Sequence, residues 1–145
     1  MRTDAVLRQL RDNRDETLLL CGVQGGVFAE GVDYPGHLAI GAFVVGPGLP
    51  MVSPERKLLE AYYETLDGTG KGFDLAYVTP GVVRAVQAVG RVIRSETDRG
   101  FVMLIGRRFG YKLYRSKLPE FWSQELVDPD DPVACVSAFW NGAAP

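Results

Sequence analysis

Residues 79–105, TPGVVRAVQAVGRVIRSETDRGFVMLI, give the clearest indication of the fold. Thr79 and Pro80 favour the start of a helix, because threonine caps the first turn and proline suits its first position. This helix is predicted to run to about Arg94. The apolar run FVMLI at 101–105 then has no helical period, which is typical of a buried parallel strand.

The same alternation of helices and apolar runs extends outward from this stretch. Two further segments are predicted to be buried strands, TLLLCGV at 17–23 and AIGAFVV at 39–45. Helices are predicted over residues 4–13 and 55–65, and over part of 111–124 with an interruption at its proline. Strands that alternate with helices predict an α/β fold with a mainly parallel sheet.

The length of 145 residues allows a single domain, residues 1–145, with a core at about 17–117 and a C-terminal extension at 118–145. Three strands are few for a parallel sheet, so the fold is expected to be incomplete at its N-terminus. No stretch is long and apolar enough to suggest a membrane span, and a cytoplasmic protein is expected.

Cysteine and histidine are too scarce for several kinds of site. Two cysteines cannot form a disulfide framework or a four-thiolate metal site, and a single histidine excludes a histidine-rich metal centre. No metal site is therefore predicted within the chain.

Positive charge is concentrated in one part of the chain. The formal net charge is −2, but residues 84–117 contain nine basic and two acidic residues. Such a block indicates either an anionic partner or an arginine-rich solvated surface, and composition alone does not separate the two.

The helix predicted to end near residue 94 has two distinct faces. At about 100° per residue, its polar side carries Gln87, Gly90, Arg91 and Arg94. Two guanidiniums one turn apart suit a polyphosphate, because each binds phosphate oxygens through two hydrogen bonds. Gly90, expected in mid-helix, would let a ligand approach between them. The alternative is an ordinary solvated helix face.

A glycine-rich segment follows the first predicted strand. Residues 25–36, GGVFAEGVDYPG, contain glycines that would allow the backbone to approach a ligand closely. Asp33 is expected at the carboxyl end of that strand, where α/β sheets bind ligands.

Together, GGVFAEGVDYPG and QAVGRVIRSETDRG resemble motifs V and VI of superfamily 2 helicases. The second motif, running into residues 101–109, is most similar to the iron–sulfur DNA helicase group that includes the XPD/Rad3 and DinG-type proteins. FDLAYV at 73–78 also fits the segment that precedes motif VI in that group. The resemblance spans about residues 17–110 and implies a three-layer RecA-like fold, the second of two ATPase lobes.

The resemblance also implies a role for each motif residue. Arg91 and Arg94 would be catalytic arginine fingers that reach the γ-phosphate of ATP bound between two lobes. Further contacts to ATP would come from Gln87, Gly90, Gly31 and Asp33, with Asp33 near the ribose. Single-stranded DNA would lie along Gly26, Val27, Phe28 and Glu30.

Other parts of such a motor are not found in this sequence. The GTGKG run at 68–72 lacks the spacing of a phosphate loop. The resemblance assigns that loop, the Mg²⁺ ligands and the iron–sulfur cluster to a first lobe, which would hold ATP and Mg²⁺. The isolated chain is therefore expected to be inactive. The family commonly has an acidic residue near residues 106–108, and its absence here leaves the role of Arg107 and Arg108 open.

The sequence leaves two main candidate functions for the chain. In the first, the chain is the second lobe of an ATP-dependent DNA helicase, and its partners are the first lobe, ATP and single-stranded DNA. In the second, it is a stand-alone nucleic-acid-binding or regulatory module that retains the fold without ATPase activity. A reading frame that continues upstream into a phosphate loop would favour the first. An unrelated α/β nucleotide binder would require both motif matches to be coincidental. Dimerisation through exposed apolar surface is a further expectation.

Overall fold

A computed structural model describes residues 3–12, 17–34, 38–67, 70–93 and 98–142. Its helices are α1 (Thr3–Asp12), α2 (Val27–Glu30), α3 (Pro54–Asp67), α4 (Thr79–Val89), α5 (Lys112–Arg115), α6 (Glu120–Glu125) and α7 (Pro132–Trp140). A π-helix, η2 (Asp74–Val78), precedes α4, and a 3₁₀ helix, η3 (Arg107–Gly110), precedes α5. The strands are β1 (Gly41–Val45) and β2 (Phe101–Ile105).

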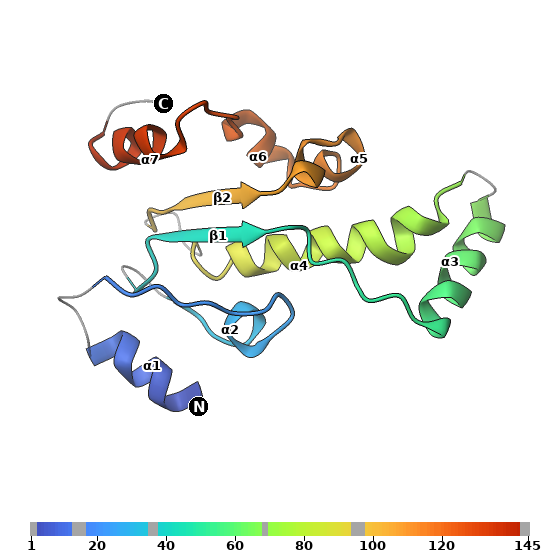
Figure 1. Cartoon of the computed structure of the whole chain (residues 1–145), viewed down its shortest axis with the longest axis horizontal. Helices are drawn as coiled ribbons and strands as arrows, with labels where there is room; N and C mark the ends of the chain where they lie inside the picture. The colour runs from blue at the N-terminus through green and yellow to red at the C-terminus, as the bar shows by residue number, and fades with distance from the viewer. Residues whose placement is uncertain (1–2, 13–16, 35–37, 68–69, 94–97, 143–145) are drawn as a thin grey trace.

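The two strands are parallel neighbours, with Gly41 opposite Phe101 and Val45 opposite Ile105. Between them in sequence, α4 returns the chain from the carboxyl ends of the strands to their amino ends (Figure 1). This arrangement is a strand–helix–strand unit, which parallel pairing requires because the chain must cross back between strands. The predicted α/β fold with a parallel sheet is confirmed.

Buried apolar side chains form two clusters, and α4 contributes to both. The first cluster contains Val44, Ala85, Val89 and Phe109, and the second contains Val78, Val82 and Tyr114. Full burial of a valine or phenylalanine side chain stabilises the fold by about 1.5–3 kcal/mol. The two clusters therefore hold η3 and α5 firmly against α4 and the sheet.

Residues 17–23 form no strand, contrary to the prediction. The sheet of the described residues contains β1 and β2 only, and Leu19 and Val23 are 78% and 79% exposed. An apolar run becomes a buried strand only where a neighbouring strand pairs with its backbone. Without that pairing, residues 17–23 run past the sheet as an irregular segment.

The helix of motif VI is shorter than predicted. It ends at Val89, and Gly90 is its C-terminal cap, with the Gly90 N–H donating to Val86 O at 2.9 Å. Arg91 and Val92 then form a turn, so Gly90 and Arg91 do not lie on one face of a continuous helix. Glycine is a poor helix former, which favours termination at this position. Arg94 lies outside the described residues.

The C-terminal part of the chain is helical. Pro119 precedes α6, as the predicted interruption requires. Asp131 caps α7, because its Oδ1 accepts hydrogen bonds from the Val133 and Ala134 N–H groups at 3.0 Å.

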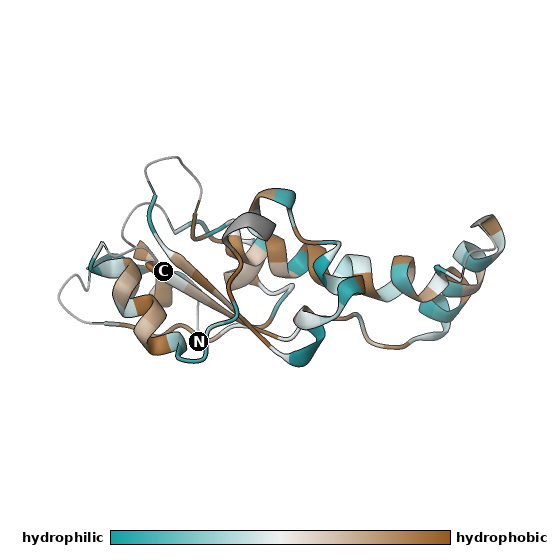
Figure 2. Ribbon diagram, turned by 90° about the horizontal axis from the view of Figure 1, so that it is seen from above, coloured by the Kyte–Doolittle hydropathy of each residue, from teal (hydrophilic) through white to brown (hydrophobic). Residues whose placement is uncertain are grey.

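Helix α3 extends away from the sheet and carries a mixture of polar and apolar residues (Figure 2).

Candidate functional site

Arg91, two residues after the end of α4, forms an ion pair with Asp33, three residues after the end of α2. Arg91 Nη1 lies 2.6 Å from Asp33 Oδ1, which is a charge-assisted hydrogen bond. The two side chains are 31% and 45% exposed, so the pair lies at the surface. The structure therefore joins the segments of motif V and motif VI at one point.

This ion pair lies at the amino ends of the strands. Gly100, the residue before β2, lies against Val92, and the Phe101 N–H donates to Ile40 O at 3.2 Å. The expectation that Asp33 lies at the carboxyl end of a strand is therefore wrong. The reason is that α2 packs along α4 and takes the chain back towards the start of β1 (Figure 1).

Tyr34 connects the two motif segments directly. Its N–H donates to Arg91 O at 3.4 Å, and its hydroxyl donates to Phe28 O in α2 at 2.9 Å. The side chain is buried, and burial raises the pKa of the Tyr34 phenol. The backbone position of Arg91 is consequently linked to the position of α2.

The glycine-rich loop lies at the other end of β1. Gln24 Nε2 donates to the carbonyl oxygen of Gly46, the residue after β1, at 2.8 Å. Gly25 has φ +83°, a conformation that residues with a side chain rarely adopt. The Arg84 side chain and the Glu30 carboxylate both approach Gly25. The loop is thus fixed at the carboxyl ends of the strands, the edge where α/β sheets commonly bind ligands.

The residues predicted to bind DNA remain together in the structure. Gly26 is the N-terminal cap of α2, a single turn that contains Val27, Phe28 and Glu30, and Gly31 is its C-terminal cap. Val27 is 56% exposed. A strand of nucleic acid following these residues would therefore meet backbone and side-chain groups of one turn.

The residues predicted to bind ATP are brought together only in part. Asp33 and Arg91 are in contact, whereas Gln87 is exposed on α4 one turn before Arg91. Gly90 lies between Gln87 and Arg91 as the helix cap. The amino-end site therefore combines Asp33, Gly90 and Arg91 within the described residues.

Sequence reasoning missed Gln24, which links the glycine-rich loop to β1. Its Oε1 is buried and has no hydrogen-bond partner among the described residues. The only sequence signal is a polar side chain between an apolar run and two glycines. Tyr34 could be assigned to neither the core nor a ligand site from sequence, and the structure places it in the core.

The chemistry available at this site is cationic. Within the described ranges, no group of three or more His, Cys, Asp or Glu residues is arranged to hold a metal ion. Among the helices of those same ranges, none is long and apolar enough to cross a membrane. Arg91 can offer a guanidinium to an anion, and the glycine-rich loop can offer backbone groups.

A parallel strand–helix–strand unit is shared by many α/β proteins with unrelated functions, so the family is established by comparison with known sequences. The chain belongs to the helicase C-terminal domain family, which matches residues 1–125. It is 34% identical over 110 residues to the general transcription and DNA repair factor IIH helicase subunit XPD of Schizosaccharomyces pombe, covering 75% of this chain and 14% of that protein.

Two other relatives show the same partial coverage. The chain is 30% identical over 145 residues to the ATP-dependent DNA helicase CHL1 of Coccidioides immitis, covering 88% of this chain and 17% of that protein. It is 32% identical over 108 residues to the 3′-5′ exonuclease DinG of Bacillus subtilis, covering 71% and 11%. The chain thus spans less than a fifth of each of these relatives.

Proposed function

We propose that this chain is the second ATPase lobe of an ATP-dependent DNA helicase of the XPD/DinG type. The observation that supports this most directly is the Arg91–Asp33 pair, which brings motif VI and motif V of one family together at the surface. In this role Arg91, with Arg94, reaches the γ-phosphate of ATP bound against the first lobe. A guanidinium there stabilises the negative charge of the transition state.

The other nucleotide contacts follow from their places around Arg91. Gln87 and Gly90 face the nucleotide from the end of α4, and Gly31 and Asp33 approach it from the segment after α2, with Asp33 near the ribose. ATP and Mg²⁺ are held mainly by the first lobe, which supplies the phosphate loop and the metal ligands. The iron–sulfur cluster also belongs to that lobe.

Single-stranded DNA lies along Gly26, Val27, Phe28 and Glu30. Tyr34 then connects the DNA-binding segment to the ATP-binding segment. Its hydroxyl donates a hydrogen bond to Phe28 O, and its N–H donates one to Arg91 O. A shift of α2 on contact with DNA is transmitted through this residue to the backbone of Arg91. The proposal therefore includes a physical connection between DNA contact and ATP hydrolysis.

The test is steady-state ATP hydrolysis with Mg²⁺ and single-stranded DNA, by the chain alone and by the chain mixed with the first lobe of a helicase of the same family. We expect turnover only in the mixture. Arg91→Ala should lower kcat by about 10³–10⁵-fold, the usual effect of removing an arginine finger. Arg8→Ala, on the exposed face of α1, is the matched control and should have no effect.

Turnover by the chain alone that is lost in Arg91→Ala would contradict the proposal. A mixture whose ATP hydrolysis is insensitive to Arg91→Ala would also contradict it.

The second candidate function is a nucleic-acid-binding module without ATPase activity. It is favoured by the basic block at residues 84–117, which has nine basic and two acidic residues and would bind phosphates by charge. An inactive mixture with salt-sensitive DNA binding by the chain would support this candidate.

A further inference from the structure

We propose that a groove at the carboxyl end of β2 is a second binding site for single-stranded nucleic acid, separate from the motif V loop. The groove has a volume of about 510 Å³, and apolar side chains of Leu104, Phe109 and Leu126 contribute to its lining. This volume is within the range of about 300–1,000 Å³ that is usual for small-molecule sites. The groove is therefore large enough to accept a base.

The polar lining of the groove suits the remaining parts of a nucleotide. Arg107, Tyr111 and Arg115 line it, and all three side chains are exposed, Tyr111 by 52%. A tyrosine ring stacks on bases of any sequence, and neighbouring guanidiniums bind the phosphates on either side. The charged residues that line the groove are Arg107, Arg115 and Asp128, two positive and one negative. This excess of one positive charge favours an anionic ligand.

The elements around the groove anchor the backbone that carries these three side chains. Gly106 has φ +138°, which lets the chain turn sharply from β2 into η3. Phe109 and Tyr114 are 5% and 6% exposed and anchor η3 and α5 in the two core clusters. An anchored site loses less conformational entropy on binding than a flexible loop does.

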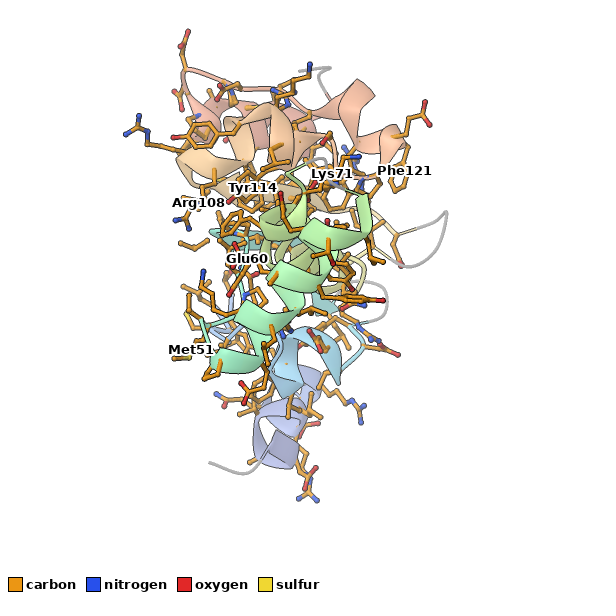
Figure 3. The ribbon with its side chains drawn as sticks, turned by 90° about the vertical axis from the view of Figure 1, so that its right-hand side faces the viewer. Met51, Glu60, Lys71, Arg108, Tyr114 and Phe121 are labelled. Carbon is orange, nitrogen blue, oxygen red and sulfur yellow. The ribbon has the colours of Figure 1, made fainter. Side chains whose placement is uncertain are left out.

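The groove adjoins the motif V loop along the same edge of the sheet. Gly106 lies against Gly46, and Gly46 O accepts the hydrogen bond from Gln24, the residue before the loop. A strand that follows α2 would therefore continue towards Arg107 past the ends of β1 and β2. Figure 3 is viewed from the side towards which both strands point, and it labels Arg108 and Tyr114 in the upper part of the molecule. Arg108 is exposed, whereas Tyr114 is buried.

This inference rests on the proposed function in one respect, namely that the nucleic acid is DNA. The binding itself needs neither ATP nor the first lobe, so it is measured with the chain alone. The probe is a fluorescein-labelled oligo-dT of about 20 nucleotides, a length that exceeds typical single-strand site sizes. Fluorescence anisotropy gives Kd at several NaCl concentrations.

The first comparison is between Arg107→Gln with Arg115→Gln and a control, Arg8→Gln with Arg11→Gln on α1, which changes the net charge equally. The groove variant should weaken binding by roughly 10-fold at low salt and reduce the slope of log Kd against log salt by about 1.4, because each single-strand phosphate contact contributes about 0.7. The α1 variant should leave both quantities unchanged.

The second comparison isolates stacking. Tyr111→Leu should weaken binding by about 5- to 160-fold, the usual range for loss of one stacked base, whereas Tyr111→Phe should retain it. Circular dichroism establishes that each variant is folded. Equal losses in the groove and α1 variants, or wild-type binding by Tyr111→Leu, would overturn the inference, as would a chain that does not bind the oligonucleotide.

These outcomes are separable from those of the proposed function. Groove-dependent binding by a chain that never forms an active ATPase would support the groove and contradict the motor. If ATP hydrolysis depends on Arg91 but DNA binding is insensitive to the groove substitutions, the motor is supported and the groove is contradicted.

Discussion

The Arg91 guanidinium donates a hydrogen bond to the Asp33 carboxylate across 2.6 Å, although 58 residues separate them in the sequence. Both side chains are partly exposed, so the pair contributes only about 0–1 kcal/mol to stability. Its main consequence is geometric, because the contact restricts the directions in which Arg91 can point. Asp33 is thus placed to act on catalysis by positioning Arg91.

Substitution Asp33→Asn should therefore impair catalysis far more than folding. We expect kcat of the mixed lobes to fall by about 10- to 100-fold, since misplacement of a catalytic group by about 1 Å commonly has such an effect. The decisive measurement is a double-mutant cycle with Arg91→Ala. If Asp33 acts by positioning Arg91, Asp33→Asn has a smaller effect once Arg91 is removed, and only the part due to the proposed ribose contact remains.

Additive effects in that cycle would contradict the positioning role. They would indicate that Asp33 contacts the nucleotide independently, as the ribose contact implied by the family resemblance requires. Urea denaturation of each variant serves as the control, and the free energy of unfolding should change by about 1 kcal/mol or less.

Gly90→Ala should separate the structural from the ligand-binding role of this glycine. Gly90 has φ −62°, and an added Cβ would meet Val86 O and Gln87 O at ordinary distances of 3.5 and 3.6 Å. Alanine should therefore raise the free energy of unfolding by about 0.4–1 kcal/mol. A fall in ATPase activity of the mixed lobes would then reflect steric hindrance of the nucleotide.

Gly25→Ala provides the contrast to Gly90→Ala. Because Gly25 has φ +83°, alanine there should lower the free energy of unfolding by about 1–2 kcal/mol. If Gly90→Ala instead lowers the free energy of unfolding by a similar amount, alanine does not fit the backbone at residue 90. That result would contradict the prediction that Gly90→Ala stabilises the protein.

Tyr34→Phe should change stability in a pH-dependent manner. At neutral pH the loss of the hydrogen bond to Phe28 O should lower the free energy of unfolding by about 0.5–1.5 kcal/mol. Burial raises the pKa of Tyr34 above its ordinary value of 10.0, so the unfolded chain ionises first as pH rises. The stabilising contribution of the phenol is complete below about pH 10 and is lost as pH rises through the folded-state pKa.

The measurement is urea unfolding of both proteins between about pH 8 and pH 11. The difference between wild type and Tyr34→Phe should narrow as pH rises, and taking the difference cancels the contributions of the other tyrosines. A constant difference across this range would show that the pKa of Tyr34 is the same in the folded and the unfolded chain.

Apolar periodicity was sufficient to predict the elements that have partners within the chain. β1 and β2 pair with each other, and α4 packs Ala85 and Val89 against Val44 of β1, so burial and sequence pattern agree there. The strand predicted over residues 17–23 failed for the opposite reason. Its apolar pattern indicates a tendency to be buried, but a strand also needs a neighbour to accept its hydrogen bonds.

The arrangement of the site could not be predicted in the same way. Contact between Asp33 and Arg91 depends on where α4 ends and on how α2 returns the chain, and helical periodicity determines neither. The basic block was predictable as a feature of charge. Only the tertiary structure shows that Arg107, Tyr111 and Arg115 share one groove.

Arg99→Ala should release α7 from the rest of the protein. The Arg99 guanidinium lies 4.8 Å from the centroid of the Phe139 ring and 5.4 Å from that of Trp140, and it also donates to Phe139 O. Each cation–π contact at an exposed site contributes about 0.5–1 kcal/mol. Loss of both should accelerate hydrogen exchange of the α7 amides by about 5- to 30-fold, while exchange in α4 stays unchanged. Arg99→Lys, which retains the charge but not the planar group, should give an intermediate rate. Unchanged exchange in Arg99→Ala would show instead that α7 is held by contacts other than those of Arg99.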